Sequence, residues 1–172
     1  DKGIEVRVHP TFISSSHPLA SVNDSFNAVY MTGDAVEDVM LYGRGAGALP
    51  TASAVVSDVI YAATHAEVKY STFKNNAEAD KNTKFITDFE SGYYLRLSVA
   101  DEVGVLAKMT SIFAKCNVSV MEIAQKGRAN EKARVPLIII THATRENSIN
   151  KAIEKINASG YATVEAFIRV EE

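Results

Sequence analysis

GRGAGALPT, residues Gly43–Thr51, is the stretch around which the fold of this chain is organised. Three glycines occupy every second position, and a proline and a threonine follow them. The next segment, Ala52–Ala63, places its larger apolar side chains on one helical face, namely those of Val55, Val56, Val59 and Ile60. This order predicts a strand, a glycine loop and a helix, an arrangement in which backbone N–H groups can meet an anion.

The glycine loop matches neither of the two common nucleotide-binding patterns. No lysine follows its last glycine, as a P-loop requires, and its glycine spacing is not G-x-G-x-x-G. Two interpretations therefore stay open. The glycines bring the backbone close to a ligand, or they let a strand turn sharply into a closely packed helix.

Composition limits the classes of function. The chain has 172 residues, enough for one large or two small domains, and 47% of them are hydrophobic. A formal net charge of −3 without a cluster of basic residues argues against a nucleic-acid partner, and the sequence contains neither a membrane span nor a signal peptide. A single cysteine, Cys116, indicates a reducing and hence cytoplasmic compartment. His9 and His17 lack the spacing of metal ligands, so no metal site is predicted.

The first forty residues predict strands and a hairpin. Ile4–Val8 alternates apolar and polar side chains, which is typical of a half-buried strand. Because the chain begins with aspartate and supplies few partners before this strand, we expect it to be cut from a longer polypeptide. Residues 10–18 contain two prolines and predict a loop. Phe26–Thr32 and Val36–Tyr42, joined by a Gly-Asp turn, predict a hairpin whose second strand leads into the glycine loop.

A second domain follows a polar linker. Lysine, asparagine and acidic side chains crowd residues 67–90, which separates a domain at 1–66 from one at 91–172. In the second domain the apolar pattern predicts strands and helices in the order βαββαβ, with strands at 93–100, 118–125, 135–142 and 161–170 and helices around 105–113 and 149–156. Gly160 is expected to end the second helix. This order is the ferredoxin-like arrangement, which hosts many functions.

The glycine loop and its helix resemble one protein family closely. Gly43–Asp58, with His17–Ala20 and Asn27–Val29 before it, resembles the end of the catalytic region of homoserine dehydrogenase. In that family this stretch leaves the substrate and dimerisation sheet and returns to the nucleotide-binding domain. The resemblance implies that Gly47 lies against the nicotinamide of NADP or NAD, with Gly45 and Thr51 as further cofactor contacts. From its position after a proline, Thr51 is also expected to cap the helix.

The second domain resembles a regulatory module. Leu97–Leu106, with the sequence LSVADEVGVL, is similar to the strand-to-helix turn of ACT domains, which bind amino acids. Homoserine dehydrogenases often carry such a domain at the C-terminus, with Q-K-G and V-P-L-x-I-x-T-H stretches that match Gln125–Gly127 and Val135–His142. The family usually has proline before the glycine of the turn, where this chain has Val103. This departure loosens the loop, which bears on ligand affinity and not on the fold.

The turn suggests how an amino acid would bind. The free N–H groups of Gly104, Val105 and Leu106 at the helix start suit a carboxylate, while Asp101 or Asn117 holds the ammonium group. Such sites usually form between two paired modules. Other roles stay open, because Asp101 also suits a helix N-cap and Asn117 suits a left-handed residue at the helix end.

Together the resemblances imply a remnant of an α/β dehydrogenase sheet with its return helix, followed by an α+β ferredoxin-like ACT domain. We expect the C-terminal portion of a homoserine dehydrogenase, which interconverts aspartate semialdehyde and homoserine, with threonine as effector and a homo-oligomer formed through the sheet and paired ACT domains. The dinucleotide-binding segment and the catalytic lysine and carboxylates are expected upstream, so no catalytic residue is assigned and the chain alone should be inactive. The apolar side chains of this helix, Val55, Val56, Val59 and Ile60, should then be exposed or repacked. The alternative is a non-catalytic amino-acid sensor.

Overall fold

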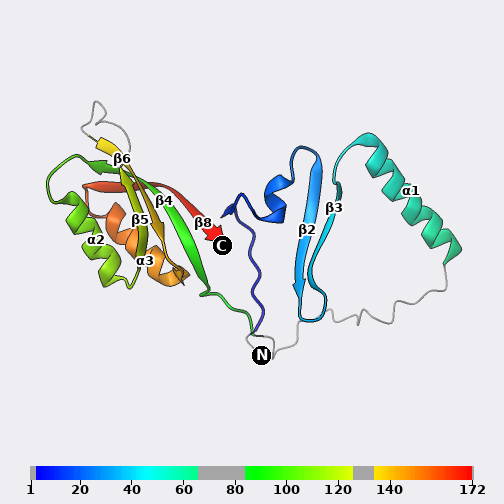
Figure 1. Ribbon diagram of the computed structural model, residues 1–172, viewed down its shortest axis with the longest axis horizontal. Helices are drawn as coiled ribbons and strands as arrows, with labels where there is room; N and C mark the ends of the chain where they lie inside the picture. Colours follow the sequence, from blue (N-terminus) through cyan, green and yellow to red (C-terminus); the bar gives the residue numbers. More distant parts are fainter. Residues whose placement is uncertain (1–2, 66–83, 126–133, 172) are drawn as a thin grey trace. The chain divides into compact units, whose positions relative to one another are not determined.

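The computed structural model describes residues 3–65, 84–125 and 134–171 (Figure 1). Its elements are, in chain order, β1 (Thr11–Ile13), the 3₁₀ helix η1 (Pro18–Ser21), β2 (Phe26–Gly33), β3 (Glu37–Arg44), α1 (Ala48–Thr64), β4 (Glu90–Ala100), α2 (Val105–Lys115), β5 (Val120–Gln125), β6 (Arg134–Thr141), β7 (Thr144–Arg145), α3 (Glu146–Asn157) and β8 (Ala162–Glu171). They form two compact units, which we call the hairpin unit, residues 14–65, and the sheet unit, residues 3–13, 84–125 and 134–171.

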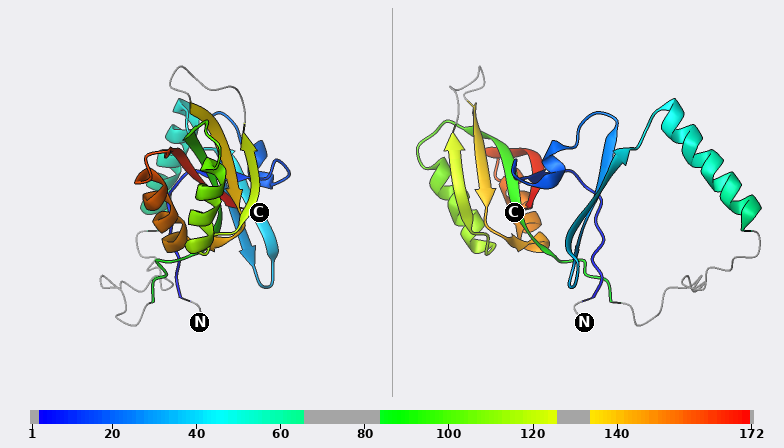
Figure 2. Two further views of the ribbon diagram at one scale, coloured as in Figure 1. Left: turned by 90° about the vertical axis from the view of Figure 1, so that its left-hand side faces the viewer. Right: turned by 45° about the vertical axis from the view of Figure 1, so that its right-hand side comes forward.

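The sheet unit confirms the predicted ferredoxin-like order. Its main sheet has the strand order β1-β8-β4-β6-β5, in which β4 lies antiparallel to β6 and β8, and β5 lies antiparallel to β6. The short β7 pairs with the start of β4. Helices α2 and α3 cover one face of this sheet (Figure 2). The parallel strand β1 is an addition to the predicted arrangement, and it lies along β8.

The core lies between this sheet and its two helices. Alternate residues of β4, from Tyr93 to Val99, point inward and are buried. Met109 and Phe113 of α2 and Ile149 of α3 meet them and are at most 1% exposed. Such burial contributes about 25 cal/mol per Å² of apolar surface removed from water. Every buried hydrophobic residue of the described chain falls between Tyr93 and Ala162.

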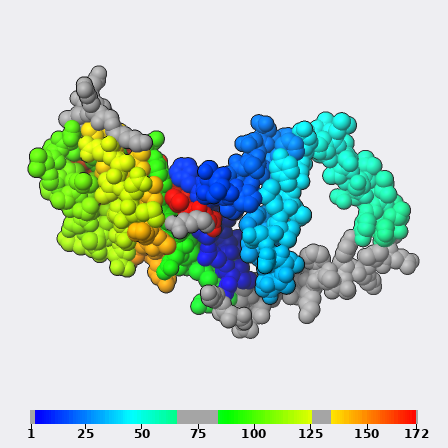
Figure 3. Space-filling model, in the orientation of Figure 1, coloured from blue at the N-terminus to red at the C-terminus, as the bar shows by residue number. Residues whose placement is uncertain are grey.

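The hairpin unit shows the predicted elements without a core. Strands β2 and β3 pair from Phe26–Arg44 to Gly33–Glu37, which confirms the hairpin. Helix α1 begins at Ala48, one turn earlier than predicted. None of the described residues 14–65 is buried, and the four apolar residues expected to be exposed on α1 are between 55 and 63% accessible. That prediction is confirmed, and α1 stands at the surface in Figure 3.

Three local predictions are wrong. Ile4–Val8 forms no strand, because only Ile4 makes a bridge, to Phe85, and Val8 is fully exposed. The predicted loop 10–18 contains β1, whose backbone completes an open edge of the sheet. The helix α3 ends at Asn157 with Ala158 as its C-cap residue, whereas Gly160, the predicted cap, lies two residues further on and is left-handed.

Two further predictions concern residues that the structure does not describe. The predicted linker lies mostly there, as do the second and third residues of the Q-K-G stretch.

In the described ranges no helix is long and apolar enough to cross a membrane.

Candidate functional site

Two glycines of the loop, Gly45 and Gly47, each meet a local steric requirement. A Cβ atom on Gly45 would lie 1.8 Å from the side-chain nitrogen of Asn27, and the Gly45 N–H donates to the carbonyl of Ser25 at 2.9 Å. Gly47 has a φ of +125°, a conformation that favours glycine. The loop therefore turns sharply because its backbone lies against the hairpin at Gly45 and adopts positive φ at Gly47.

Gly47 also opens helix α1. It is the N-cap residue, and no side chain caps the helix. The N–H of Thr51 donates to the carbonyl of Gly47 at 3.1 Å, so Thr51 lies inside the first turn and the prediction that it caps the helix is wrong. A cavity of about 470 Å³ lies beside this turn, lined by Arg44, Ala46, Gly47, Ala48, Leu49 and Pro50. Gly47 thus faces the cavity, whereas Gly45 and Thr51 are not part of its lining.

The hairpin carries a polar cluster that the sequence did not reveal. The Thr32 hydroxyl donates to Asp38 at 2.7 Å across the two strands. Hydrogen bonds from Tyr30 and Thr32 lower the pKa of Asp38, and the same bond to Asp38 raises the pKa of Tyr30. The His17 ring contacts the Tyr30 ring edge to face, with 4.9 Å between centroids. Because strand residues two apart share a face, the cluster follows from the register of the hairpin.

The loop between β4 and α2, residues 101–104, is the predicted effector site. Gly104 is left-handed, with φ +88°, and is the N-cap residue of α2 without any side-chain cap. The interpretation of Asp101 as the cap is therefore wrong. The Val105 N–H donates to the carbonyl of Glu102 at 3.3 Å, which leaves Leu106 as the better placed donor in the first turn.

The space beside this loop is small within one chain. A cavity of about 50 Å³ is lined by Asp101, Glu102, Val105 and Leu106 on one side and by Gln125 of β5 on the other. Pockets for small molecules typically have about 300 to 1,000 Å³. Val103, which stands where the family usually has proline, is fully exposed. Among the described residues of one chain, the space at this loop is therefore smaller than a typical small-molecule pocket.

Asn117 lies at the opposite end of α2 from Gly104. The helix has 11 residues, and at about 1.5 Å per residue it separates its two ends by about 16 Å. Asn117 has a φ of 57°, and the N–H groups of Asn117 and Val118 donate to the carbonyls of Ala114 and Phe113, each at 3.0 Å. This is a Schellman helix end. The left-handed role left open for Asn117 is confirmed, and the two parts of the predicted effector site do not meet within one copy.

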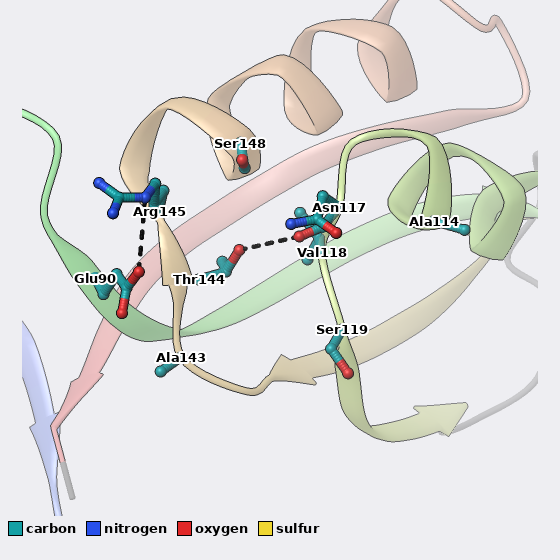
Figure 4. Close-up of a pocket in the computed structure, with 9 residues that line it drawn as sticks. All are labelled: Glu90, Ala114, Asn117, Val118, Ser119, Ala143, Thr144, Arg145 and Ser148. Atoms are coloured by element: carbon teal, nitrogen blue, oxygen red, sulfur yellow. Dashed lines mark hydrogen bonds and ion pairs between the residues drawn. The ribbon is translucent and has the colours of Figure 1, made fainter.

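Asn117 instead borders a larger cavity of about 390 Å³ (Figure 4). Its lining comes from the end of α2 and from the segment that joins β6 to α3, including Ser119, Thr144, Arg145 and Ser148. The Thr144 hydroxyl donates to the carbonyl of Asn117 at 3.4 Å, and Arg145 lies 3.6 Å from Glu90 at the rim. No sequence pattern indicated this cavity, because its residues come from separate elements.

A partly buried polar network joins β4, α3 and β8. The Tyr93 hydroxyl donates to Glu146 at 2.6 Å, and the Arg169 guanidinium pairs with the other oxygen of the same carboxylate. Burial, followed by the bond to Glu146, raises the pKa of Tyr93 above its ordinary value. These residues lie 53 and 23 positions apart in the chain, so no spacing pattern could have linked them.

Comparisons with known proteins match both parts of the chain. A homoserine dehydrogenase family model matches residues 2–60, and an ACT domain model matches residues 93–160. The crystal structure of a homoserine dehydrogenase from Thiobacillus denitrificans superposes with a TM-score of 0.82 at 37% identity, covering 100% of this chain and 40% of that one. This chain belongs to the homoserine dehydrogenase family. Its two matched parts are the end of the catalytic region and the ACT domain, the C-terminal portion of the enzyme.

Curated homoserine dehydrogenases agree with this assignment. The Pseudomonas aeruginosa enzyme is 39% identical over 100% of this chain and 41% of its own length, and the Bacillus subtilis enzyme is 37% identical over 90% and 36%. The S. aureus structure at pH 7.0 gives a TM-score of 0.53 at 26% identity, covering 94% of this chain and 36% of that one. The chain thus spans about two fifths of the length of these homoserine dehydrogenases.

Proposed function

We propose that this chain is part of an enzyme that interconverts aspartate semialdehyde and homoserine with NADP or NAD, and that an amino acid, threonine, regulates it through the ACT domain. Family membership supports the reaction, and the glycine loop carries the assignment within the chain. Gly47 lines an open cavity whose other residues are mostly small or apolar. A planar ring fits against such a backbone, because no side chain at Gly47 holds it away.

The residues around this cavity fit a nicotinamide cofactor. Gly47 and the start of α1 would hold the ring, with Gly45 shaping the loop behind it and Thr51 one turn into the helix. When bound, the cofactor supplies or accepts the hydride. The chain's own contribution is to present backbone and small side chains to the ring, and no residue of this chain is proposed to transfer a proton.

The chain alone should therefore not catalyse the reaction. The test is an assay of the purified 172-residue chain for NADP-dependent oxidation of homoserine, with an intact homoserine dehydrogenase as the positive control. We expect no turnover, because the sequence contains no G-x-G-x-x-G segment to bind the dinucleotide. Measurable turnover by this chain alone would contradict the proposal that the reaction needs residues that the chain does not contain.

The effector site is proposed to form between two copies of the chain. Two observations support this: the cavity at the loop 101–104 is about 50 Å³, and Asn117 lies at the far end of α2 from Gly104. A second copy would bring its own residues to the loop and enlarge the site. In this proposal Asp101 attracts the ammonium group, and the free N–H groups in the first turn of α2, that of Leu106 foremost, bind the carboxylate.

Calorimetry tests the effector assignment. Threonine should bind to the chain, whereas valine, which has the same shape without the hydroxyl, should bind more weakly. Replacing Asp101 by Asn should weaken threonine binding, while the neighbouring change Glu102→Gln should not. Sedimentation should show dimers that become more stable with threonine. Equal affinities in the two variants would remove Asp101 from the site, and binding to a monomer would contradict the two-copy arrangement.

The competing function is an amino-acid sensor without a catalytic role. The same calorimetry with NADP, carried out on the full-length protein, separates the two. Binding of both NADP and threonine supports the enzyme, and binding of threonine alone supports the sensor.

A further inference from the structure

The first described residues of the chain belong physically to the ACT domain. The homoserine dehydrogenase family model covers residues 2–60, yet residues 3–13 fold as part of the sheet unit. Strand β1 lies parallel to β8, with Thr11 opposite Arg169 and Ile13 opposite Glu171. Further back, the Ile4 N–H donates to the carbonyl of Lys84 at 2.8 Å, and the Ile86 N–H donates to the carbonyl of Ile4 at 2.9 Å.

Side chains reinforce this attachment. The ring of Phe12 meets Tyr94 of β4 edge to face, with centroids 5.2 Å apart. The guanidinium of Arg7 lies 4.3 Å from the centre of the Phe89 ring, and that of Arg169 in β8 lies 5.4 Å from the same ring. The segment 3–13 is thus held at several points along its length.

Strand β8 joins this attachment to the effector loop. At its end, residues 169–171 pair with β1. Just before its beginning, the carbonyl of Tyr161 accepts a hydrogen bond of 2.8 Å from the N–H of Ala100, which directly precedes the effector loop. The strand has 10 residues and spans about 33 Å. The strand thus begins beside the end of β4, next to the effector loop, and ends on β1, the segment that leads into the hairpin unit.

The middle of β8 is a point where its twist can change. Its register against β4 shifts between Arg96 and Leu97, so that Glu165 is the extra residue of a β-bulge. Bulges bend a strand and increase its local twist. Arg96 lies 3.4 Å from Glu165 and spans the bulge. A movement at one end of β8 can thus reach the other end through a change at the bulge.

We propose that residues 3–13 act as a strand of the regulatory sheet, and that β8 couples the effector loop to β1 and so to the hairpin that ends in the glycine loop. The covalent path is short, because Ile13 is followed directly by Ser14 of the hairpin unit. Effector binding that orders the loop then also stabilises the pairing of β1 with β8. The role of the loop in this scheme rests on the effector assignment under the proposed function.

The first test needs no ligand. Hydrogen exchange, followed by NMR on the whole chain, is compared in the wild type, in Phe12→Ala and in Tyr42→Ala. The control removes an aromatic ring of similar exposure, 52% against 46% for Phe12, from the hairpin unit. Removing the Phe12 ring should loosen β1 and speed exchange of the Ala100 amide by about fivefold, in the range of ordinary coupling energies. Unchanged protection of the buried amides of β6 shows that the variant remains folded.

The second test uses reciprocity. If threonine binding and β1 pairing are coupled, Phe12→Ala should weaken threonine affinity, by at most the factor by which threonine favours the pairing of β1, about fivefold. The Tyr42→Ala control should bind as the wild type does.

The outcomes separate this inference from the proposed function. Exchange at Ala100 that is unaffected by Phe12→Ala overturns the coupling, whether or not threonine binds. Faster exchange at Ala100 in a chain that does not bind threonine supports the coupling and contradicts the effector instead. Faster exchange combined with an unchanged threonine affinity overturns the role of β8 in regulation.

Discussion

Helices α1 and α3 both carry an apolar stripe, and only α3 buries it. In α3, Ile149, Ala152 and Ile156 are fully buried against the sheet and α2. In α1, Val59 and Ile60 are 63 and 58% exposed, and no residue of the helix is buried. Helical periodicity is present in both. The difference lies in the partner, because α3 faces a sheet of its own unit and α1 has no cover among the described residues. Periodicity thus identifies an apolar face, and only a second surface turns that face into a core.

The proposed function identifies the missing surface. Under the proposed function, the helix after the glycine loop returns to a nucleotide-binding domain, as the family resemblance implies. An exposed face on α1 is what such a return helix shows when that domain is not part of the structure. The following predictions test the contrast between a region with its own core and one that lacks it, beginning with the largest effect.

Matched truncations in the two helices should differ most. Ile156→Ala in α3 should destabilise the sheet unit by about 2 to 5 kcal/mol, because it opens a cavity in a packed core. Ile60→Ala in α1 should change stability by less than about 0.5 kcal/mol, as expected for an exposed position. Urea denaturation followed by near-ultraviolet circular dichroism measures both. Equal losses would show that α1 is buried in solution, by self-association or otherwise, and would remove the contrast.

The partly buried network of the sheet unit should give an intermediate effect. Tyr93→Phe removes the hydroxyl that donates to Glu146 at 2.6 Å and should cost about 1 to 3 kcal/mol, because the carboxylate loses a charge-assisted bond. Tyr42→Phe on the exposed hairpin is the matched control and should be neutral. A neutral Tyr93→Phe would mean that Arg169 alone satisfies Glu146.

The same tyrosine predicts a pH dependence with a defined sign. The pKa of Tyr93 is raised in the folded state, so its contribution to stability is fully present below the unfolded value of about 10 and is lost as the pH rises above it. The free energy of unfolding should therefore fall above about pH 10 in the wild type, and less so in Tyr93→Phe. Parallel pH profiles for the two proteins would contradict this account.

The smallest effect is expected at the glycine loop. Gly45→Ala should cost about 1 kcal/mol of hairpin stability, because its Cβ would lie 1.8 Å from the Asn27 side chain, which must move aside. Gly43→Ala is the control, since nothing lies within 4 Å of its added Cβ. Chemical shifts of β2 and β3 and the thermal stability of the hairpin report the difference. If the two variants behave alike, the close approach of Gly45 to Asn27 does not hold in solution.

Much of the fold followed from the sequence. Period-2 alternation in β4, the apolar run of β6, the Gly-Asp turn of the hairpin and the apolar stripes of the helices predicted these elements, because each pattern is local. The strand β1 was missed because its pairing depends on β8, more than 150 residues later in the chain. The prediction of a strand at Ile4–Val8 was wrong for the opposite reason. Among the described residues, the only strand-like pairing of this segment is the bridge from Ile4 to Phe85.

The same distinction between local patterns and long-range contacts applies to the candidate sites. Sequence motifs located the glycine loop and the loop 101–104, because glycines at turns leave a local signature. They could not show that Asn117 lies at the other end of α2, nor that Tyr93, Glu146 and Arg169 meet. The sequence by itself determined which segments form strands, helices and turns, and which family they resemble. Only the tertiary structure decided which apolar faces are buried and which distant residues share a site, because those depend on contacts between segments far apart in the chain.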